Sequence, residues 1–173
     1  MASTEKILLC GFMGSGKSTL IEKLRENEVA SDWQFLDLDQ VIFEREGKGF
    51  EYLGQWIEYV GFERFRMSEA DILSELLDSP KSMVLALGGG TIEHHQKILE
   101  PWFSNMVWLD VDFALCWERI SHHHGRPLVK SGKNALENLY QDRVEGYSKA
   151  QGRLNKLEID YIDTLDHLKD RLS

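Results

Sequence analysis

The sequence is poor in cysteine and proline, with only two cysteines and three prolines among 173 residues. Cys10 and Cys116 lie in apolar segments and lack the spacing of metal ligands, which excludes a disulfide-stabilised scaffold and a zinc module. We expect both thiols to be buried, in a protein of a reducing compartment.

Basic residues are also scarce relative to acidic ones. The 20 lysines and arginines face 29 aspartates and glutamates, which gives a formal net charge of −9. Binding to nucleic acid or to an anionic membrane needs a basic face, so this composition argues against both partners. A small anionic substrate remains compatible with it, because a pocket can be locally basic on an acidic protein.

Long apolar runs are absent as well. About five apolar residues precede the first glycines, fewer than the core of a signal peptide contains. No stretch approaches the roughly 18 apolar residues of a membrane span. We therefore expect a soluble, cytoplasmic protein.

Short apolar runs alternate with helical patterns along the chain. The predicted strands are Lys6–Cys10, Trp33–Leu38, Ser82–Leu87, Met106–Leu109 and Lys156–Ile162. The predicted helices are Ser18–Glu28, Gln40–Glu46, a segment ending near Leu77, Asp112–Ile120, Ala135–Gln151 and Thr164–Leu172. Such alternation indicates βαβ units. We predict an α/β fold, a three-layer α/β/α sandwich around a five-stranded parallel sheet, as a single domain over residues 1–173.

A glycine-rich loop, GFMGSGKST at residues 11–19, follows the first predicted strand. Gly11, Gly16, Lys17 and Ser18 satisfy the spacing of a phosphate-binding loop between a strand and a helix. Glycines allow the backbone to turn its N–H groups toward phosphate oxygens, and the helix start adds a positive dipole. The loop predicts a nucleoside-triphosphate site, and the small domain favours a kinase.

Two carboxylates follow in the stretch FLDLD at residues 35–39. On a strand, Asp37 and Asp39 would share one side and face the crevice at the carboxyl end of the sheet. There they could divide the tasks of binding Mg²⁺ and activating an acceptor hydroxyl. Equally, the segment could be a solvated turn with Asp39 as a helix N-cap.

Further candidates are a run of three glycines and two arginines. Gly88–Gly90 ends a predicted strand, which suggests either close approach to a ligand or a flexible turn. Arg66 and Glu69 are neighbours on a predicted helix, as in a surface salt bridge. Arg143 could simply pair with an acidic neighbour in the sequence.

Taken together, these segments resemble shikimate kinase, a small member of the nucleoside-monophosphate-kinase-like P-loop family. The matching stretches are GFMGSGKST, FLDLDQVI, FERFRMSE, LALGGGTI, RISHHHGRPLV and YQDRVEGY. They extend over roughly residues 6–165. The phosphate loop is shared with many families, whereas the combination of motifs is much more specific.

The resemblance implies a site for Mg-ATP. The ATP-binding residues would be Gly14, Ser15, Gly16, Lys17, Ser18, Thr19, Arg119 and Arg126. Arg119 would stack on the adenine, and Arg126 would swing in on a lid over residues 121–134 to neutralise the transferring phosphoryl group. Ser18 and Asp37 would lie at the metal.

The resemblance likewise implies an acceptor site for shikimate, partly formed by an insertion over residues 39–70. The substrate-binding residues would be Asp39, Arg66, Gly88, Gly89, Gly90 and Arg143. The arginines would hold the carboxylate, with Glu69 bracing Arg66. Lys17, Asp39 and Arg126 would be catalytic, in transfer of the γ-phosphoryl group of ATP to the 3-hydroxyl. The family expectation is a monomer.

The chain departs from the family pattern in the acceptor region. Phe62 follows Gly61 where the family commonly has a glutamate. The family's R-x-P-x-Y motif reads RVEGY at residues 143–147, so its proline is missing and Glu145 stands close to Arg143. If Glu145 faces the pocket, it would weaken binding of an anion. A related kinase acting on gluconate or a nucleotide, or a non-catalytic ATP-binding homologue, therefore remains an alternative.

Overall fold

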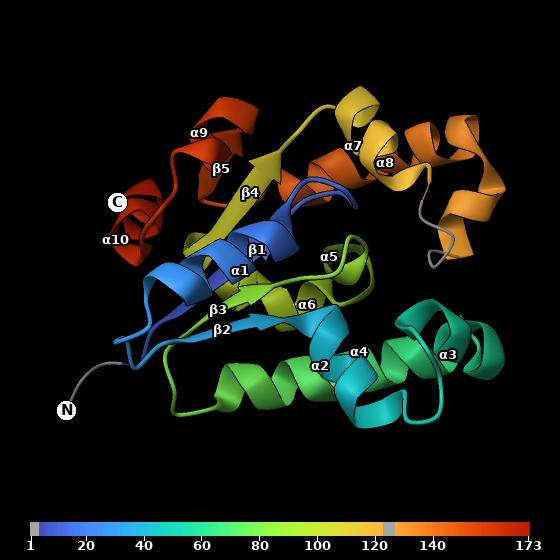
Figure 1. Cartoon of the computed structure of the whole chain (residues 1–173), viewed down its shortest axis with the longest axis horizontal. Helices are drawn as coiled ribbons and strands as arrows, with labels where there is room; N and C mark the ends of the chain where they lie inside the picture. Colours follow the sequence, from blue (N-terminus) through green and yellow to red (C-terminus); the bar gives the residue numbers. More distant parts are fainter. Residues whose placement is uncertain (1–3, 123–126) are drawn as a thin grey trace.

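A computed structural model describes residues 4–122 and 127–173. The chain forms a five-stranded parallel sheet in the order β2-β3-β1-β4-β5 (Figure 1). The strands are β1 (Lys6–Cys10), β2 (Gln34–Asp37), β3 (Met83–Ala86), β4 (Met106–Asp110) and β5 (Gly152–Asn155).

Helices surround this sheet (Figure 1). The α-helices are α1 (Lys17–Asn27), α2 (Leu38–Glu46), α3 (Leu53–Val60), α4 (Phe62–Asp78), α5 (Thr91–His94), α6 (Gln96–Leu99), α7 (Phe113–Ile120), α8 (Lys133–Tyr147), α9 (Lys156–Asp160) and α10 (Leu165–Lys169). The 3₁₀ turns are η1 (Glu100–Asn105), η2 (Pro127–Ser131) and η3 (Asp170–Leu172). α1 packs on β2 and β3, while α2, α3 and α4 pack together. The predicted three-layer α/β/α sandwich is confirmed.

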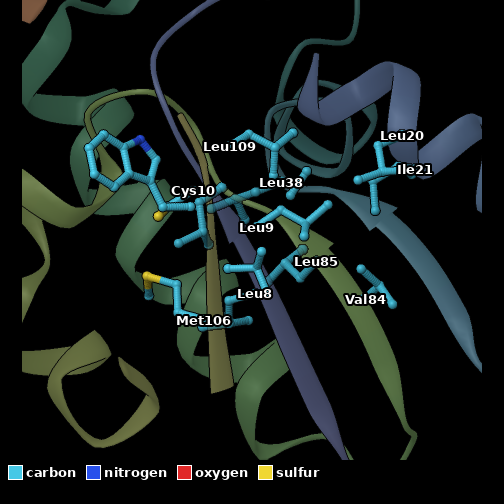
Figure 2. Packing of buried hydrophobic residues seen from close by; sticks show 14 of the residues in the cluster. Leu8, Leu9, Cys10, Leu20, Ile21, Leu38, Val84, Leu85, Met106 and Leu109 are labelled. Carbon is cyan, nitrogen blue, oxygen red and sulfur yellow. The ribbon is translucent and has the colours of Figure 1, made fainter. Parts of the chain in front are cut away.

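The central strands are buried along their whole length, as expected for a parallel sheet covered by helices. Leu8 of β1 pairs in register with Leu85 of β3 and with Met106 of β4. Figure 2 shows these side chains together with Leu20 and Ile21 of α1, which close the core over the sheet.

The strand order brings three turns together. β3 lies between β1 and β2, and all three strands run parallel. The phosphate loop after β1, Asp37 at the end of β2 and the glycines after β3 therefore share the carboxyl edge of the sheet, where ligands of α/β proteins bind.

The prediction for the last strand is wrong. β5 is Gly152–Asn155, and the segment predicted as a strand contains the helix α9. The side chain of Asn155 accepts a hydrogen bond from the N–H of Glu158, whose carboxylate accepts one from the N–H of Asn155. This capping box starts a helix, and it outweighs the alternating apolar pattern.

The prediction that Asp37 and Asp39 share a strand is also wrong. β2 ends at Asp37, which is the N-cap of α2 and accepts hydrogen bonds from the N–H groups of Asp39 and Gln40. Asp39 lies in the first turn of α2. The alternative of an N-cap therefore applies to Asp37 rather than to Asp39.

Both cysteines are buried, as expected. Burial raises the pKa of the Cys10 thiol and raises that of Cys116 to about 11, so neither forms a thiolate at neutral pH. Within residues 4–122 and 127–173, no helix has the length and apolar character needed to cross a membrane.

The packing predicts a large stability effect at the centre of the sheet. Leu85→Ala should lower the free energy of unfolding by about 2–5 kcal/mol, because Leu85 is 0% exposed and its removal leaves a cavity. Leu157→Ala is the matched control, since Leu157 is 71% exposed and its loss should change stability by about 0.5 kcal/mol or less. Urea unfolding of both variants measures the difference, and equal effects would contradict the described core.

Candidate active site

The phosphate loop has the backbone shape that its glycines allow. Gly11, Gly14 and Gly16 have positive φ angles of 145°, 83° and 99°. Lys17 is the first residue of α1, and its Nζ donates hydrogen bonds to the carbonyls of Gly11 at 2.7 Å and Phe12 at 3.1 Å. The lysine thus lies folded along the loop, with its charge beside the helix N-terminus. This arrangement suits an anion.

Ser18 joins the phosphate loop to the end of β2. Its Oγ donates a hydrogen bond to Oδ2 of Asp37, whose Oδ1 caps α2. A hydroxyl and a carboxylate are hard oxygen donors, the kind that Mg²⁺ prefers, so the residues fit that ion. Among the described residues, no cluster of three histidine, cysteine or carboxylate ligands forms a separate metal cage.

A cavity of about 570 Å³ extends along this loop. Its lining is formed by residues Met13–Leu20, Lys23, Asp37, Asp39, Leu87–Gly89, Arg119, Ile120, Lys156, Ile159 and Asp160. Nη1 of Arg119 donates a hydrogen bond to the Gly14 carbonyl at 2.8 Å, so this arginine lies against the loop. The predicted ATP-binding residues of the described chain line this cavity. Arg126 lies outside the described residues.

A second cavity of about 390 Å³ adjoins the first. The two share Met13, Ser18, Asp37, Asp39, Gly88 and Gly89 in their linings. The second is completed by apolar side chains of α3, α4 and η2 and by Arg66, Glu69, Gly90 and Arg143. The carboxylates of Asp37 and Asp39 therefore stand at the junction of a phosphate site and an arginine-containing site.

The two arginines converge on Gly90. A methyl group in place of its hydrogen would lie 2.6 Å from Nη2 of Arg143 and 2.9 Å from Nη2 of Arg66. Any side chain at position 90 would displace the guanidinium groups, which explains the glycine. Two guanidinium groups at one wall of a cavity have the geometry and charge to bind a carboxylate.

Glu69 is a buried carboxylate that holds Arg66. It is 0% exposed and accepts hydrogen bonds from Arg66, from Oγ1 of Thr91 at 2.7 Å and from His95 at 2.8 Å. Burial alone raises the pKa of Glu69, but the hydrogen bond from His95, the Arg66 charge and the Thr91 hydroxyl together bring it below its ordinary value. The carboxylate is ionised at neutral pH, and Arg66 belongs to a buried network rather than to a surface pair.

Arg143 also pairs with a glutamate that sequence reasoning did not identify. Its Nε donates to Oε2 of Glu93 at 2.9 Å. Glu145 is exposed and does not line the second cavity, so the expected conflict with an anionic substrate does not arise from it. Tyr147 was missed too; its hydroxyl donates to the carbonyl of Gly89 at 2.5 Å. Nothing in the spacing of Glu93 or His95 marks them, because their partners are distant in the sequence.

Comparison with known proteins identifies the family. The family model described as shikimate kinase matches residues 13–167. The chain belongs to the shikimate kinase family. A shikimate kinase of Lactococcus lactis is 37% identical over 147 residues, covering 83% of this chain and 82% of the relative. One of Staphylococcus haemolyticus is 34% identical over 145 residues, covering 83% and 80%.

A bifunctional relative shows a longer architecture. The shikimate kinase/3-dehydroquinate synthase of Thermotoga maritima is 30% identical over 172 residues, which are 96% of this chain and 33% of that protein. The chain thus spans a third of its length.

Solved structures agree with the family assignment. The shikimate kinase of Acinetobacter baumannii in complex with shikimate superposes with a TM-score of 0.73 at 28% identity, covering 88% of this chain and 83% of that one. That of Aquifex aeolicus gives 0.71 at 28% identity, covering 95% and 92%. As a member of the shikimate kinase family, the protein is an ATP-dependent small-molecule kinase, as the sequence motifs predict.

The lowered pKa of Glu69 predicts how its contribution to stability depends on pH. That contribution is fully present at neutral pH and is lost as the pH falls from about 4.3 through the lower pKa of the folded state. Glu69→Gln should lower the free energy of unfolding by about 1–3 kcal/mol at pH 7. Below about pH 4.3, the free energy of unfolding of this variant should decrease less steeply with falling pH than that of the wild type. Glu26→Gln, at an exposed position of α1, is the matched control. If the free energy of unfolding of wild type and of Glu69→Gln depended on pH in the same way, Glu69 would not be the ionised centre of this network.

Proposed function

We propose that the protein transfers the γ-phosphoryl group of ATP to the 3-hydroxyl of shikimate, giving shikimate 3-phosphate and ADP. The observation that carries the proposal is the junction of the two cavities at Ser18, Asp37 and Asp39. A phosphate loop on one side and a pair of arginines on the other bring a phosphoryl donor and an acidic acceptor to one point. Family membership supports this pairing of substrates.

On the donor side, we assign the phosphates of ATP to the loop and to Lys17. The loop N–H groups and the start of α1 offer hydrogen bonds and a positive dipole, and Lys17 adds a full charge. Arg119 packs along the loop at Gly14 and forms a wall for the base. Arg126 stays a candidate for neutralising the transferred group.

Mg²⁺ accompanies the nucleotide in phosphoryl transfer and supplies charge neutralisation at the phosphate oxygens. Ser18 and Asp37 are the residues assigned to hold it. Mg²⁺ usually takes one or two protein oxygens together with phosphates and water, so two residues suffice. Their mutual hydrogen bond keeps the two oxygens in place.

On the acceptor side, Arg66, Arg143 and the backbone at Gly89 and Gly90 are assigned to the carboxylate of shikimate. The ring would lie against the apolar side chains of the same cavity. A methyl group at Gly88 would come within 3.0 Å of Oδ1 of Asp39, so this carboxylate lies close to the glycine turn. Asp39 is the group that orients the acceptor hydroxyl and takes its proton.

η2 forms the opposite wall of the acceptor cavity. Pro127 and Leu128 line it, and Lys130 forms an ion pair with Glu58 of α3. This ion pair is solvent-exposed and joins η2 to α3, both of which contribute residues to the cavity. Closure of the site around bound substrates would exclude water, which competes as a phosphoryl acceptor.

The test of the proposed function is ADP release by the purified protein with Mg-ATP and shikimate, gluconate or no acceptor. ADP release should depend on shikimate, and Arg66→Ala should raise the KM for shikimate about tenfold or more through loss of a charge-assisted hydrogen bond. Release with gluconate alone would assign the chain to the alternative acceptor class. Tight ATP binding without turnover on any acceptor would favour a non-catalytic homologue.

Asp39→Asn should lower kcat by about 10²–10⁴, because the amide fills the same volume without accepting a proton. The KM for ATP should stay close to that of the wild type. Asp32→Asn is the matched control, since Asp32 is exposed and lines neither cavity. An unchanged kcat in Asp39→Asn, measured in the same assay, would remove Asp39 from the reaction.

A further inference from the structure

One short segment, residues 91–95, contacts Arg143 directly and contacts Glu69, the partner of Arg66. It consists of α5 and the residue after it, directly following Gly90. Thr91 and His95 bind the carboxylate of Glu69, and Glu93 binds Arg143. No part of this segment is needed for the phosphate chemistry assigned above. Three of its polar side chains nevertheless contact Glu69 or Arg143.

The contacts to Glu69 fix Arg66. The carboxylate of Glu69 has one oxygen on Thr91 and the other on both His95 and Arg66. An ionised carboxylate only accepts hydrogen bonds, so Nε2 of His95 carries the proton in this contact. Glu69 accepts a hydrogen bond from Nη1 of Arg66, and Nη2 of the same guanidinium group lies at Gly90.

The contact to Glu93 fixes Arg143 in the same manner. The Arg143 side chain is 5% exposed, while that of Glu93 is 46% exposed. The pair uses Nε of Arg143, which leaves Nη2 at Gly90 and Nη1 near Gly89. A guanidinium held at Nε has a defined plane, which a two-point contact with a carboxylate requires.

The charges of the two arginines are balanced before any acceptor arrives. Arg66 and Arg143 are offset by Glu69 and Glu93, so net positive charge does not account for attraction of an anion. Affinity must then come from the placement of N–H donors. Placement is a matter of geometry, and the geometry depends on the partners of the arginines.

We propose that Glu93 and His95 are positioning residues that set the planes and separation of the Arg143 and Arg66 guanidinium groups, and thereby the selectivity for an acceptor carboxylate. This inference rests on the proposed function and deepens it. Glu93 acts on Arg143 directly. His95 acts on Arg66 through Glu69.

The test compares steady-state kinetics of paired variants with shikimate and with its carboxamide. Glu93→Ala and His95→Leu remove the contacts and should raise the KM for shikimate about tenfold, as for loss of a hydrogen bond to a charged group. Glu93→Gln keeps an oxygen for Nε of Arg143, and His95→Gln keeps an N–H donor, so both should stay within about threefold of the wild type. The KM for ATP and kcat should change little in all four variants.

The carboxamide separates positioning from a general structural role. Its amide presents one acceptor oxygen and an NH₂ donor, so it cannot accept hydrogen bonds from a guanidinium group at two points. The ratio of kcat/KM between Glu93→Ala and wild type should therefore be near one with this acceptor. Glu26→Ala, exposed on α1 and outside both cavities, is the control for handling and surface charge.

Several outcomes would overturn the inference. Equal losses with shikimate and carboxamide, or a parallel change in the KM for ATP, would show a merely structural role. A lower KM in both Glu93 variants would show that Glu93 acts by repulsion. If the wild type turns over shikimate and Glu93→Ala and His95→Leu keep the wild-type KM for shikimate, the inference alone is overturned. If the wild type does not turn over shikimate, the proposed function is overturned together with the inference.

Discussion

The parallel pairing of β3 with both β1 and β2 is the constraint on which the site depends. It brings the ends of three strands to one edge, although the turns that follow them are separated by tens of residues in the sequence. The phosphate loop, the Asp37 cap and the glycine turn thereby become neighbours. Ser18 then joins the first two by a single hydrogen bond to Asp37. The buried leucines of the central strands hold this register, so the packing that stabilises the core also positions the residues of the site.

The acceptor half is organised by ion pairs rather than by net charge. Both arginines are paired with glutamates, one of them fully buried, in a protein whose net charge is −9. A buried carboxylate is stable only with several hydrogen bonds, and Glu69 has them from three side chains. Such pairing lets an acidic protein place two guanidinium groups at one cavity without a broad basic surface. The glycine at position 90 supplies the space in which the guanidinium groups meet.

Sequence reasoning was effective where the chemistry is local. The phosphate loop needs a fixed spacing of glycines, lysine and serine, and four of the five strands follow from short apolar runs. The fifth was misplaced because the capping box of Asn155 and Glu158 starts a helix in an alternating segment. The sequence did not predict Glu93 and His95 as site residues, because their partners, Arg143 and Glu69, are distant in the sequence and come close only in the folded protein. Both aspartates were assigned to the right edge of the sheet, but Asp39 lies in α2 rather than in β2, because Asp37 ends the strand and caps that helix.

The central claim is that the two cavities hold donor and acceptor in one orientation. The most direct measurement is phosphorus–proton correlation NMR of the product formed from Mg-ATP and shikimate. The account predicts one phosphorylated product, with the phosphorus coupled to the proton on carbon 3. A mixture of phosphate isomers, or inorganic phosphate beside unchanged shikimate, would contradict it.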